Sequence, residues 1–312
     1  MRAAVLTAYG VPTFGTFPDP EPTDGFATIA VKAAGLNPID LAIAAGKIAA
    51  RMPQLPSVAG SEGVGLMDDG ARVYFNGCKA PYGAMAERTL VAPARTLPVP
   101  DGISDGVAVA LGIAGLTAWL SLSWRARLAP GEHVLILGAS GAVGLLAVQA
   151  ASLLGAGRII AAARSAEGLE RARAAGAHAT VVLEGSESDI AAAIRAESGN
   201  RLDVIIDPLW GVPAAAALQA ASAGARLVQL GSSAGGQMPF NPAFMRGPQI
   251  SLLGFSSGTV PQPEKAAAYA ALCAAVLRGD LSIPVESLPL AKVAEAWQRQ
   301  ADFPHHKLVL EP

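Results

Sequence analysis

Three glycines at regular spacing follow a short apolar run near the middle of the chain. Val134–Leu137 precedes Gly138, Gly141 and Gly144 in the segment GASGAVG, and a helical pattern begins immediately afterwards. Glycines let such a turn bend tightly and approach a pyrophosphate, while the helix N-terminus offers free N–H groups. The G-x-x-G-x-x-G spacing departs from the standard fingerprint, and small-residue turns also serve plain helix–sheet packing. A strand before, a helix after and a second strand about twenty residues on favour dinucleotide binding. The predicted phosphate contacts are Ser140, Gly141, Ala142, Val143 and Gly144.

The second strand of this pattern ends without a carboxylate. Ile160–Ala163 is followed by Arg164 and Ser165, where an NAD site usually places Asp or Glu against the ribose hydroxyls. The planar donor fork of Arg164 suits a 2′-phosphate, and Ser165 offers a hydroxyl beside it. Alternatively, Arg164 is a solvated side chain and Ser165 only caps the helix that follows. The missing acid favours NADP over NAD, because an acidic strand end normally excludes the phosphate.

Four polar side chains in the first hundred residues are further candidates, and each has a structural alternative. Asn37, before Pro38, is either a turn residue or a binding residue. Asp40 either caps the segment LAIAAG or takes part in chemistry. Tyr82 is a proton donor, a stacking ring or a core tyrosine with a satisfied hydroxyl. Glu62 is better explained as a buried structural carboxylate. The four histidines form no recognisable triad or metal pair.

The composition describes a chain that can bury a large core. Of its 312 residues, 52% are hydrophobic and 15% are charged. At about 150 residues per domain, the length predicts two domains. Lys and Arg number 23 against 25 Asp and Glu, so the chain lacks the excess positive charge that binds a phosphate backbone. A nucleic-acid partner is therefore not expected.

Cysteine usage and hydropathy bear on the compartment. Cys78 and Cys273 lie far apart, with neither C-x-x-C nor clustered histidine, so we expect no disulfide framework and no zinc cage. Residues 107–124 and 134–157 are uncharged and long enough to cross a bilayer. Glycines interrupt both, which favours buried core over a membrane span. The start of the chain lacks the features of a secretory signal. We therefore expect a cytoplasmic protein without a membrane partner.

The predicted elements change character near residue 130. Before it, Pro and Gly separate short β-prone segments at 3–7, 27–35, 71–75 and 86–93, which predicts a compact β-rich domain. After it, apolar strands alternate with helices, which is typical of βαβ units and a parallel sheet with helices on both faces. The predicted strands are HVLILG, RIIAAA, ATVVL, DVIIDP, RLVQLGS and ISLLGF; the helices run through Leu154 and Ala175 and over 187–197, 213–222 and 264–278. The tail reads as a helix and a strand that return to complete the first domain.

Six segments together resemble one known family. They are GLNPID at 35–40, GSEGVG at 60–65, YGAMAE at 82–87, GLTA at 115–118, GASGAVG at 138–144 and HKLVL at 306–310. The chain resembles the medium-chain dehydrogenase/reductase superfamily and, more narrowly, its zinc-independent NADPH:quinone oxidoreductase branch, which includes the zeta-crystallin-like proteins. The resemblance implies an α/β fold with two domains. A β-rich GroES-like catalytic domain would comprise 1–118 and 262–312, and a Rossmann NADP-binding domain with a doubly wound parallel sheet would comprise 119–261.

The resemblance also bears on metal use and on the reaction. Zinc alcohol dehydrogenases of the superfamily hold their catalytic metal partly through a Cys in G-x-C-H-x-D and a His in G-H-E. Here Asn37 and Ser61 stand in those places, so no metal site is expected. The resemblance implies transfer of hydride from NADPH to a quinone or an α,β-unsaturated carbonyl. The alternatives are an NADP-dependent alcohol dehydrogenase or carbonyl reductase, and a non-catalytic NADPH-binding protein.

The family's roles carry over to particular positions. The catalytic candidates are Asn37, Asp40, Tyr82 and Thr117. Besides the turn at 140–144, the expected cofactor contacts are Asn37, Pro38, Thr117, Arg164, Ser165, Gly231, Ser232, Gly254, Phe255 and Lys307.

The chain departs from the family's pattern in three places. Ala42 replaces a frequent tyrosine, Leu183 an aromatic residue near the adenine, and Gly168 the usual phosphate-binding lysine. Arg164 would then have to bind the 2′-phosphate without that lysine. A homodimer is expected, with residues 249–255 as the pairing edge strand.

Overall fold

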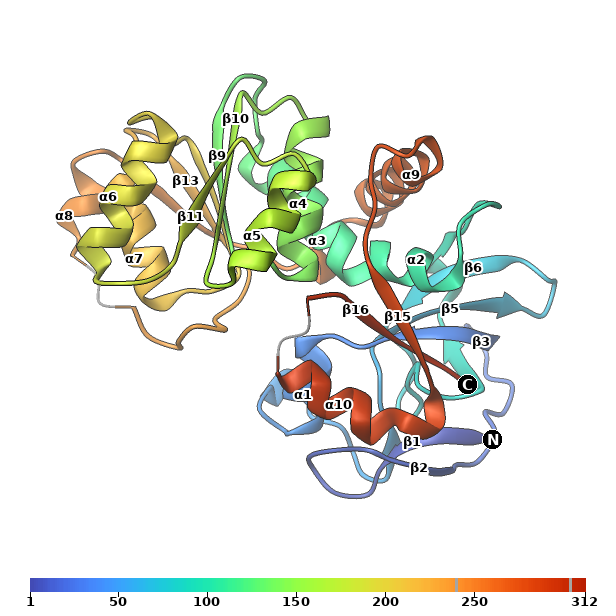
Figure 1. The fold of residues 1–312 in the computed structure, drawn as a ribbon. Helices are drawn as coiled ribbons and strands as arrows, with labels where there is room; N and C mark the ends of the chain where they lie inside the picture. Colours follow the sequence, from blue (N-terminus) through green and yellow to red (C-terminus); the bar gives the residue numbers. More distant parts are fainter. Residues whose placement is uncertain (239–240, 303–304) are drawn as a thin grey trace. The chain divides into compact units, whose positions relative to one another are not determined.

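Residues 1–238, 241–302 and 305–312 are described in a computed structural model. The chain divides into two compact units, one of Met1–Ile113 with Gln262–Pro312 and the other of Ala114–Pro261 (Figure 1). Each unit has its own sheet and core, and each is described below by itself.

The first unit is built on a mixed sheet whose strand order is β15-β16-β3-β5-β6-β8, with β7 pairing on β3. A smaller sheet has the order β2-β1-β4. The strands are β1 (Arg2–Leu6), β2 (Thr13–Thr16), β3 (Ala27–Gly35), β4 (Ser57–Val58), β5 (Glu62–Met67), β6 (Arg72–Asn76), β7 (Arg88–Val91), β8 (Thr96–Pro98), β15 (Val285–Pro289) and β16 (Lys307–Glu311). The helices are α1 (Pro38–Ala44), α2 (Asp105–Ala110), α9 (Gln262–Arg278) and α10 (Val293–Ala301), with short turns η1 (Ala49–Arg51), η2 (Pro93–Arg95) and η6 (Leu290–Lys292).

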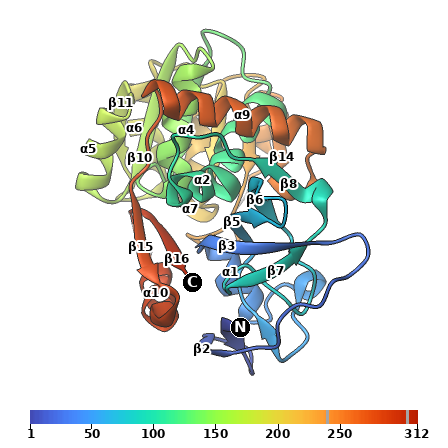
Figure 2. The same cartoon turned by 90° about the vertical axis from the view of Figure 1, so that its right-hand side faces the viewer.

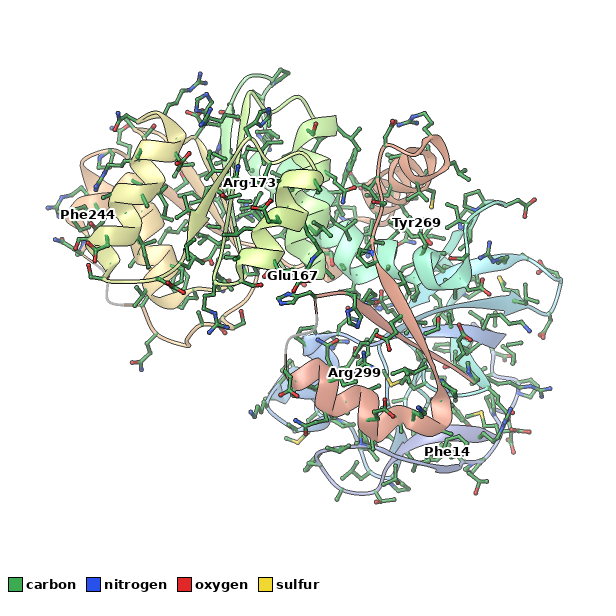
Figure 3. All side chains as sticks on the ribbon, in the orientation of Figure 1. Phe14, Glu167, Arg173, Phe244, Tyr269 and Arg299 are labelled. Atoms are coloured by element: carbon green, nitrogen blue, oxygen red, sulfur yellow. The ribbon has the colours of Figure 1, made fainter. Side chains whose placement is uncertain are left out.

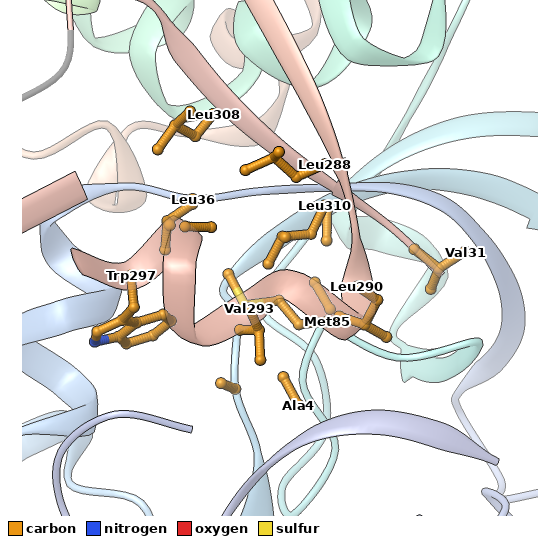
Figure 4. Packing of buried hydrophobic residues seen from close by; sticks show 14 of the residues in the cluster. Ala4, Val31, Leu36, Met85, Leu288, Leu290, Val293, Trp297, Leu308 and Leu310 are labelled. Atoms are coloured by element: carbon orange, nitrogen blue, oxygen red, sulfur yellow. The ribbon is translucent and has the colours of Figure 1, made fainter. Parts of the chain in front are cut away.

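The C-terminal tail, residues 285–312, belongs to this unit. Strand β16 runs parallel to β15 and antiparallel to β3, and Figure 2 shows β15 and β16 side by side. Figure 4 shows how Leu308, Leu310 and Trp297 from the tail pack with Leu36 and Met85 from the first hundred residues. All five side chains are buried, so loss of the tail would expose an apolar core.

Ion pairs hold α10 against the start of the tail strand. Arg299 on α10, labelled in Figure 3, donates to Glu286 of β15 at 2.8 Å and 2.5 Å. His306 Nε2 lies 2.8 Å from Glu286 Oε2. Because His306 precedes Lys307, this half-buried cluster helps to fix the position from which the Lys307 side chain enters the unit.

The second unit is a doubly wound parallel sheet of strand order β11-β10-β9-β12-β13-β14. The strands are β9 (His133–Leu137), β10 (Arg158–Ala163), β11 (Ala179–Val182), β12 (Val204–Asp207), β13 (Arg226–Gln229) and β14 (Ser251–Gly254). The helices are α3 (Leu116–Leu120), α4 (Ala142–Leu153), α5 (Ala166–Ala174), α6 (Glu187–Ser198), α7 (Gly211–Ala220) and α8 (Ala243–Arg246), with η4 (Ser121–Ala126) and η5 (Ser257–Thr259).

The central strands are apolar along their whole length because helices cover both faces of the sheet. Val134–Leu137 and Val204–Asp207 are buried at every position, as in parallel sheets generally. Helices α4 and α5 lie on one side of the strands and α6 and α7 on the other (Figure 1). The predicted alternation is thereby confirmed. The last strand is shorter than predicted, because Gln249 has a left-handed backbone with φ of 58° and β14 begins at Ser251.

One helical stretch, Asp105–Ala126, has the length and hydropathy of a membrane span. Its composition alone does not make it one, since 67% of its most apolar window is buried in the protein. The backbone at Gly112 also leaves the helical region, with ψ of −112°. This stretch contains the uncharged segment 107–124, for which the sequence favours buried core over a membrane span.

Candidate active site

Most of the predicted cofactor residues of the second unit follow parallel strands. The turn 138–144 follows β9, Arg164 and Ser165 follow β10, Gly231 and Ser232 come shortly after β13, and Gly254 and Phe255 end or follow β14. Parallel strands place their carboxyl ends at one edge of the sheet, and in open sheets ligands bind outside that edge. The structure therefore brings these residues to a single edge.

The glycine turn has the geometry of a phosphate-binding loop. Gly138 has φ of 64°, and Gly141 is the N-cap residue of α4. A Cβ atom at Gly144 would lie 2.3 Å from the carbonyl oxygen of Gly138 and 2.6 Å from Cα of Ala139, so only glycine lets α4 approach the strand. A Cβ atom at Gly141 would have only the oxygen of Gly138 nearby, at 3.6 Å. Gly144 thus allows close packing of the helix on the strand, while the space beside Gly141 at the helix N-terminus is open. A pyrophosphate fits this turn.

The end of β10 presents a free cation. Arg164 is exposed and forms no hydrogen bond or ion pair with any residue that the structure describes. Ser165 is the N-cap residue of α5, and its Oγ accepts a bond of 3.1 Å from the N–H of Gly168. The capping role of Ser165 is thus real, whereas Arg164 has no structural task within the described chain.

Gly168 lacks a side chain for a packing reason. A Cβ atom there would lie 2.3 Å from Cβ of Ser140, so the first turn of α5 can rest on the glycine turn only without a side chain. Glu167, labelled in Figure 3, points its carboxylate to Arg171 at 2.5 Å and leaves Arg164 unpaired. The family's lysine cannot be restored at this position without a shift of either segment.

Thr117 is placed beside the end of β14. Its Oγ1 is hydrogen-bonded to Oγ of Ser257 in η5 at 3.2 Å. At the same strand end, the ring of Phe255 lies 6.2 Å from that of Trp124, in a tilted arrangement. The structure thereby joins Thr117 to the same strand end as Gly254 and Phe255, although the sequence separates them widely.

Asp207, at the carboxyl end of β12, was not predicted from the sequence. Its Oδ1 accepts the N–H groups of Leu209 at 2.9 Å and Trp210 at 2.8 Å, whereas Oδ2 has no partner in the described ranges. The side chain is fully buried, and burial raises its pKa to about 6. The signal was an acid at the end of the apolar run DVIID, which reasoning about the cofactor turn alone does not use.

In the first unit, three predicted residues meet in one buried polar network. Lys307 Nζ donates to Asn37 Oδ1 at 2.5 Å and to Glu62 Oε1 at 2.8 Å. Asn37 Nδ2 donates to Glu62 Oε1 at 2.8 Å and to Asp40 Oδ2 at 3.3 Å. Glu62 is 0% exposed, Lys307 2% and Asp40 3%. Asn37 is the N-cap residue of α1, and its backbone N–H also donates to Asp40 Oδ2, at 2.9 Å.

Gly35 and Gly112 leave room for the carboxylate of Glu62 because neither has a side chain. A Cβ atom at Gly35 would lie 2.5 Å from Glu62 Oε1, and one at Gly112 would lie 2.5 Å from Oε2. Oε2 accepts the hydroxyl of Tyr74 at 2.9 Å and the backbone N–H of Ile113 at 2.6 Å. Burial and the neighbouring carboxylate hold the pKa of Tyr74 well above its usual range. The contact of Tyr74 with Glu62 was not predicted, because an aromatic residue in a strand is usually part of the hydrophobic core.

Of the two buried acids, Asp40 has no direct contact with the positive charge of Lys307, whereas Glu62 does. Its Oδ1 lies 2.6 Å from Ser61 Oγ, and Lys307 contacts Glu62 directly but not Asp40. Burial raises the pKa of Asp40, and the charge of Glu62 adds to this, against the hydrogen bond from Ser61 and the charge of Lys307. The network thus contains two carboxyl groups and one ammonium.

Tyr82 lies outside this network but beside it. Its hydroxyl donates to the carbonyl of Asp19 at 3.3 Å, and its ring meets that of Phe17 edge-on, with centroids 5.9 Å apart. It lines a cavity of about 450 Å³ whose wall also includes Asp40 and Ser61. Pro38 begins α1 and is exposed, next to Asn37.

Within the described residues, no group of three or more His, Cys, Asp and Glu side chains is arranged to hold a metal ion. At the places where zinc relatives carry metal-binding Cys and His, Asn37 binds the Lys307 ammonium and Ser61 binds Asp40. Amide and hydroxyl groups are poor zinc ligands compared with thiolate and imidazole.

Comparison with known proteins gives a consistent result. The family model described as zinc-binding dehydrogenase matches residues 142–274. Quinone oxidoreductase of Rattus norvegicus is 31% identical over 287 residues, which cover 89% of this chain and 85% of the relative. A mycobacterial protein solved in complex with NADPH has a TM-score of 0.90 at 26% identity, and quinone oxidoreductase of Thermus thermophilus one of 0.84 at 30%. Both alignments cover 100% of both chains. This chain belongs to the medium-chain dehydrogenase/reductase superfamily, among the quinone oxidoreductases.

Proposed function

We propose that this protein is an NADPH-dependent oxidoreductase that reduces a quinone or an α,β-unsaturated carbonyl. The observation that carries the proposal is Arg164, an exposed cation that has no partner among the described residues and lies beside a glycine turn that fits a pyrophosphate. An acid at that place would repel a 2′-phosphate, whereas a guanidinium binds it through two parallel N–H groups. The quinone oxidoreductases among its relatives supply the acceptor class.

The residues of the second unit would hold the cofactor. Backbone N–H groups of 140–144 would bind the pyrophosphate at the start of α4, and Arg164 with Ser165 would bind the 2′-phosphate. The other contacts would come from Thr117, Gly231, Ser232, Gly254 and Phe255. Bound NADPH would supply the hydride.

The first unit would contribute Asn37, Pro38 and Lys307. Both amide hydrogens of Asn37 are used by Asp40 and Glu62, so its side chain can offer a further partner only the second lone pair of Oδ1. Lys307 uses two of its three N–H donors on Asn37 and Glu62, which leaves one. We infer that these residues meet hydroxyl groups of the cofactor or acceptor, where one donor and one acceptor are both useful.

We further propose that the reaction needs no zinc. The Lys307 ammonium supplies the positive charge that balances Glu62, and the ligand types at the superfamily's zinc positions are unsuited to the metal. Reduction of a conjugated acceptor spreads the developing charge over its oxygen, so positioning and hydrogen bonds suffice.

Two further features complete the proposal. Cys78 and Cys273 are both free thiols, which fits a reducing compartment such as the cytoplasm. Strand β14 is an edge strand with exposed Ser251 and Leu252, which fits a homodimer that pairs these edges.

The test is the loss of nicotinamide absorbance for protein dialysed against a chelator. NADPH and NADH are compared with a simple quinone and, separately, with an enone. Turnover that prefers NADPH and survives the chelator is the expected result. Oxidation of an alcohol with NADP⁺ and no quinone turnover would favour the alcohol dehydrogenase alternative. Tight NADPH binding without any turnover would favour a non-catalytic binder.

A further inference from the structure

The cavity beside the buried network has the composition of a small-molecule site. Its volume of about 450 Å³ falls in the range of ligand pockets. Apolar side chains such as Ile43 and Met52 form much of the wall, with the Tyr82 ring at one side. The polar groups include Asp40 and Ser61, and both are nearly buried. An apolar pocket with a buried hydroxyl–carboxyl pair suits a flat carbonyl compound.

The hydrogen bonds of Asp40 determine which of its oxygens carries a proton. Oδ2 already accepts two N–H groups of Asn37, from the backbone at 2.9 Å and the side chain at 3.3 Å. A proton on the carboxyl group therefore belongs on Oδ1, which faces Ser61 Oγ at 2.6 Å. In the structure Ser61 Oγ donates this bond to Oδ1. Once the carboxyl group is protonated, Oδ1–H can donate to Ser61 Oγ instead, and the hydroxyl hydrogen of Ser61 can then point into the cavity.

Burial and the charge of Glu62 favour the protonated form of Asp40, and they act against the hydrogen bond from Ser61 and the charge of Lys307. Glu62 is an anion on β5, and the Lys307 ammonium on β16 is bound to Glu62 rather than to Asp40. From η1, exposed Arg51 reaches Ser61 Oγ at 3.4 Å, too far for a strong bond. The thiol of Cys78 also lines the cavity and stays neutral, since burial raises its pKa to about 11. Burial, with Glu62 adding to it, raises the pKa of Asp40.

We propose that Ser61 is a catalytic residue that protonates the acceptor oxygen in this cavity, with Asp40 as the proton store behind it. The inference rests on the proposed function. As hydride reaches the acceptor, its conjugated oxygen gains negative charge, and the Ser61 O–H bond breaks to form the new O–H bond. The Asp40 Oδ1–H bond breaks in turn and its proton moves to Ser61 Oγ. Asp40 is left as a carboxylate and regains a proton from water after product leaves.

The experiment measures kcat and KM for a quinone with NADPH between pH 5 and 9. In the wild type, kcat falls at high pH, because Asp40 loses the proton that it must deliver. Asp40→Asn keeps the acceptor for Asn37 but holds no transferable proton. It lowers kcat on the order of 100-fold and abolishes the high-pH decline. Ser61→Ala lowers kcat similarly with little change in KM, and Ser61→Thr restores much of it. Exposed Ser287 on β15 supplies the control, because Ser287→Ala changes neither constant.

An infrared measurement tests the proton store independently of turnover. In an Asp207→Asn background, which removes the other buried carboxyl group whose pKa is raised, the protein with Asp40 shows the C=O stretch of a protonated carboxylic acid that titrates above the range of ordinary aspartates, and Asp40→Asn removes it. Absence of such a band overturns the proposal, as does a Ser61→Ala variant with wild-type kcat at every pH. A wild type that reduces no quinone overturns the proposed function, and this step with it. An active wild type whose kcat does not depend on pH overturns only the proton donor.

Discussion

At the scale of single residues, we expect the preference for NADPH over NADH to depend on Arg164. Its guanidinium has no partner among the described residues, so its removal takes nothing from the fold. We expect Arg164→Ala to raise the Kd of NADPH roughly 10- to 100-fold, the loss of one charge-assisted pair of hydrogen bonds worth about 1.5–3 kcal/mol. The Kd of NADH should change less than twofold. Fluorescence titration of both cofactors measures this.

The control for that experiment is an arginine that already has a partner. Arg173 on α5 (Figure 3) hydrogen-bonds Thr180 and is exposed, so Arg173→Ala should leave both Kd values unchanged. Equal weakening of NADPH and NADH by Arg164→Ala would remove the 2′-phosphate assignment.

A second residue, Asp207, predicts a pH dependence of stability. Its folded pKa of about 6 lies above the ordinary value of 3.8. The free energy of unfolding is therefore highest below pH about 4. It falls as the pH rises from there through 6, because the unfolded chain ionises at the lower pH while the buried carboxyl group holds its proton. Asp207→Asn stays neutral and its amide oxygen can still accept from Leu209 and Trp210. We expect the free energy of unfolding of the variant to gain about 2–3 kcal/mol on the wild type between pH 4 and 7.5.

Denaturant unfolding at several pH values checks this prediction, with exposed Asp68→Asn as the matched control. Parallel pH profiles for wild type and Asp207→Asn would show that Asp207 ionises at its ordinary pKa. A variant that is less stable at every pH would mean instead that the loop 208–210 needs the carboxylate itself.

At the scale of elements, the sequence predicts the strands and helices of the second unit well and the polar network of the first poorly. Short apolar runs such as 134–137, bounded by turn residues, indicate buried parallel strands, because a strand with helices on both faces of its sheet is buried at every position. The network joins Asn37, Ser61, Glu62 and Lys307 across up to 270 positions, and no local pattern contains that pairing. The resemblance named Asn37 and Lys307 but not their contact. Tyr74 and Asp207 have no periodic signal at all.

The junction of β9 and α4 yields a prediction about one glycine. Gly144→Ala would place a Cβ atom 2.3 Å from the carbonyl oxygen of Gly138, so the helix must move away from the strand. Overpacking of this kind costs about 1–3 kcal/mol. We expect a lower unfolding temperature and at least a tenfold weaker binding of NADPH, because the N–H groups at the start of α4 move with the helix.

Gly141, in the same turn, is the matched control for the packing effect of Gly144→Ala. Gly141 has φ of −85°, and a Cβ atom there would meet nothing closer than 3.6 Å. Gly141→Ala should therefore keep the wild-type unfolding temperature in the absence of cofactor. Calorimetry of both variants distinguishes the cases: equal unfolding temperatures for Gly144→Ala and wild type would contradict the close contact.

At the scale of the whole molecule, the open edges of the parallel sheet determine how two copies could associate. Strands β11 and β14 are the two edges, and each exposes one large apolar side chain, Val182 at 47% and Leu252 at 37%. Exposed edges pair readily with another copy unless a charge blocks them. We propose that the expected homodimer pairs through the β14 edge. Phe244, also exposed and labelled in Figure 3, precedes that strand in α8 and adds apolar surface to the same end of the unit.

We expect Leu252→Lys to convert a dimer into a monomer, because two lysines facing each other across a symmetric strand pair repel and must lose hydration. Val182→Lys places the same charge on the opposite edge and should leave the dimer intact. Light scattering at several protein concentrations measures the mass directly. Dissociation by Val182→Lys alone would move the interface to β11, and a wild type of single-chain mass at every concentration would remove the dimer. Because the proposed cofactor residues lie at the carboxyl edge of the strands, monomeric Leu252→Lys should still bind NADPH with the wild-type Kd, which separates assembly from cofactor binding.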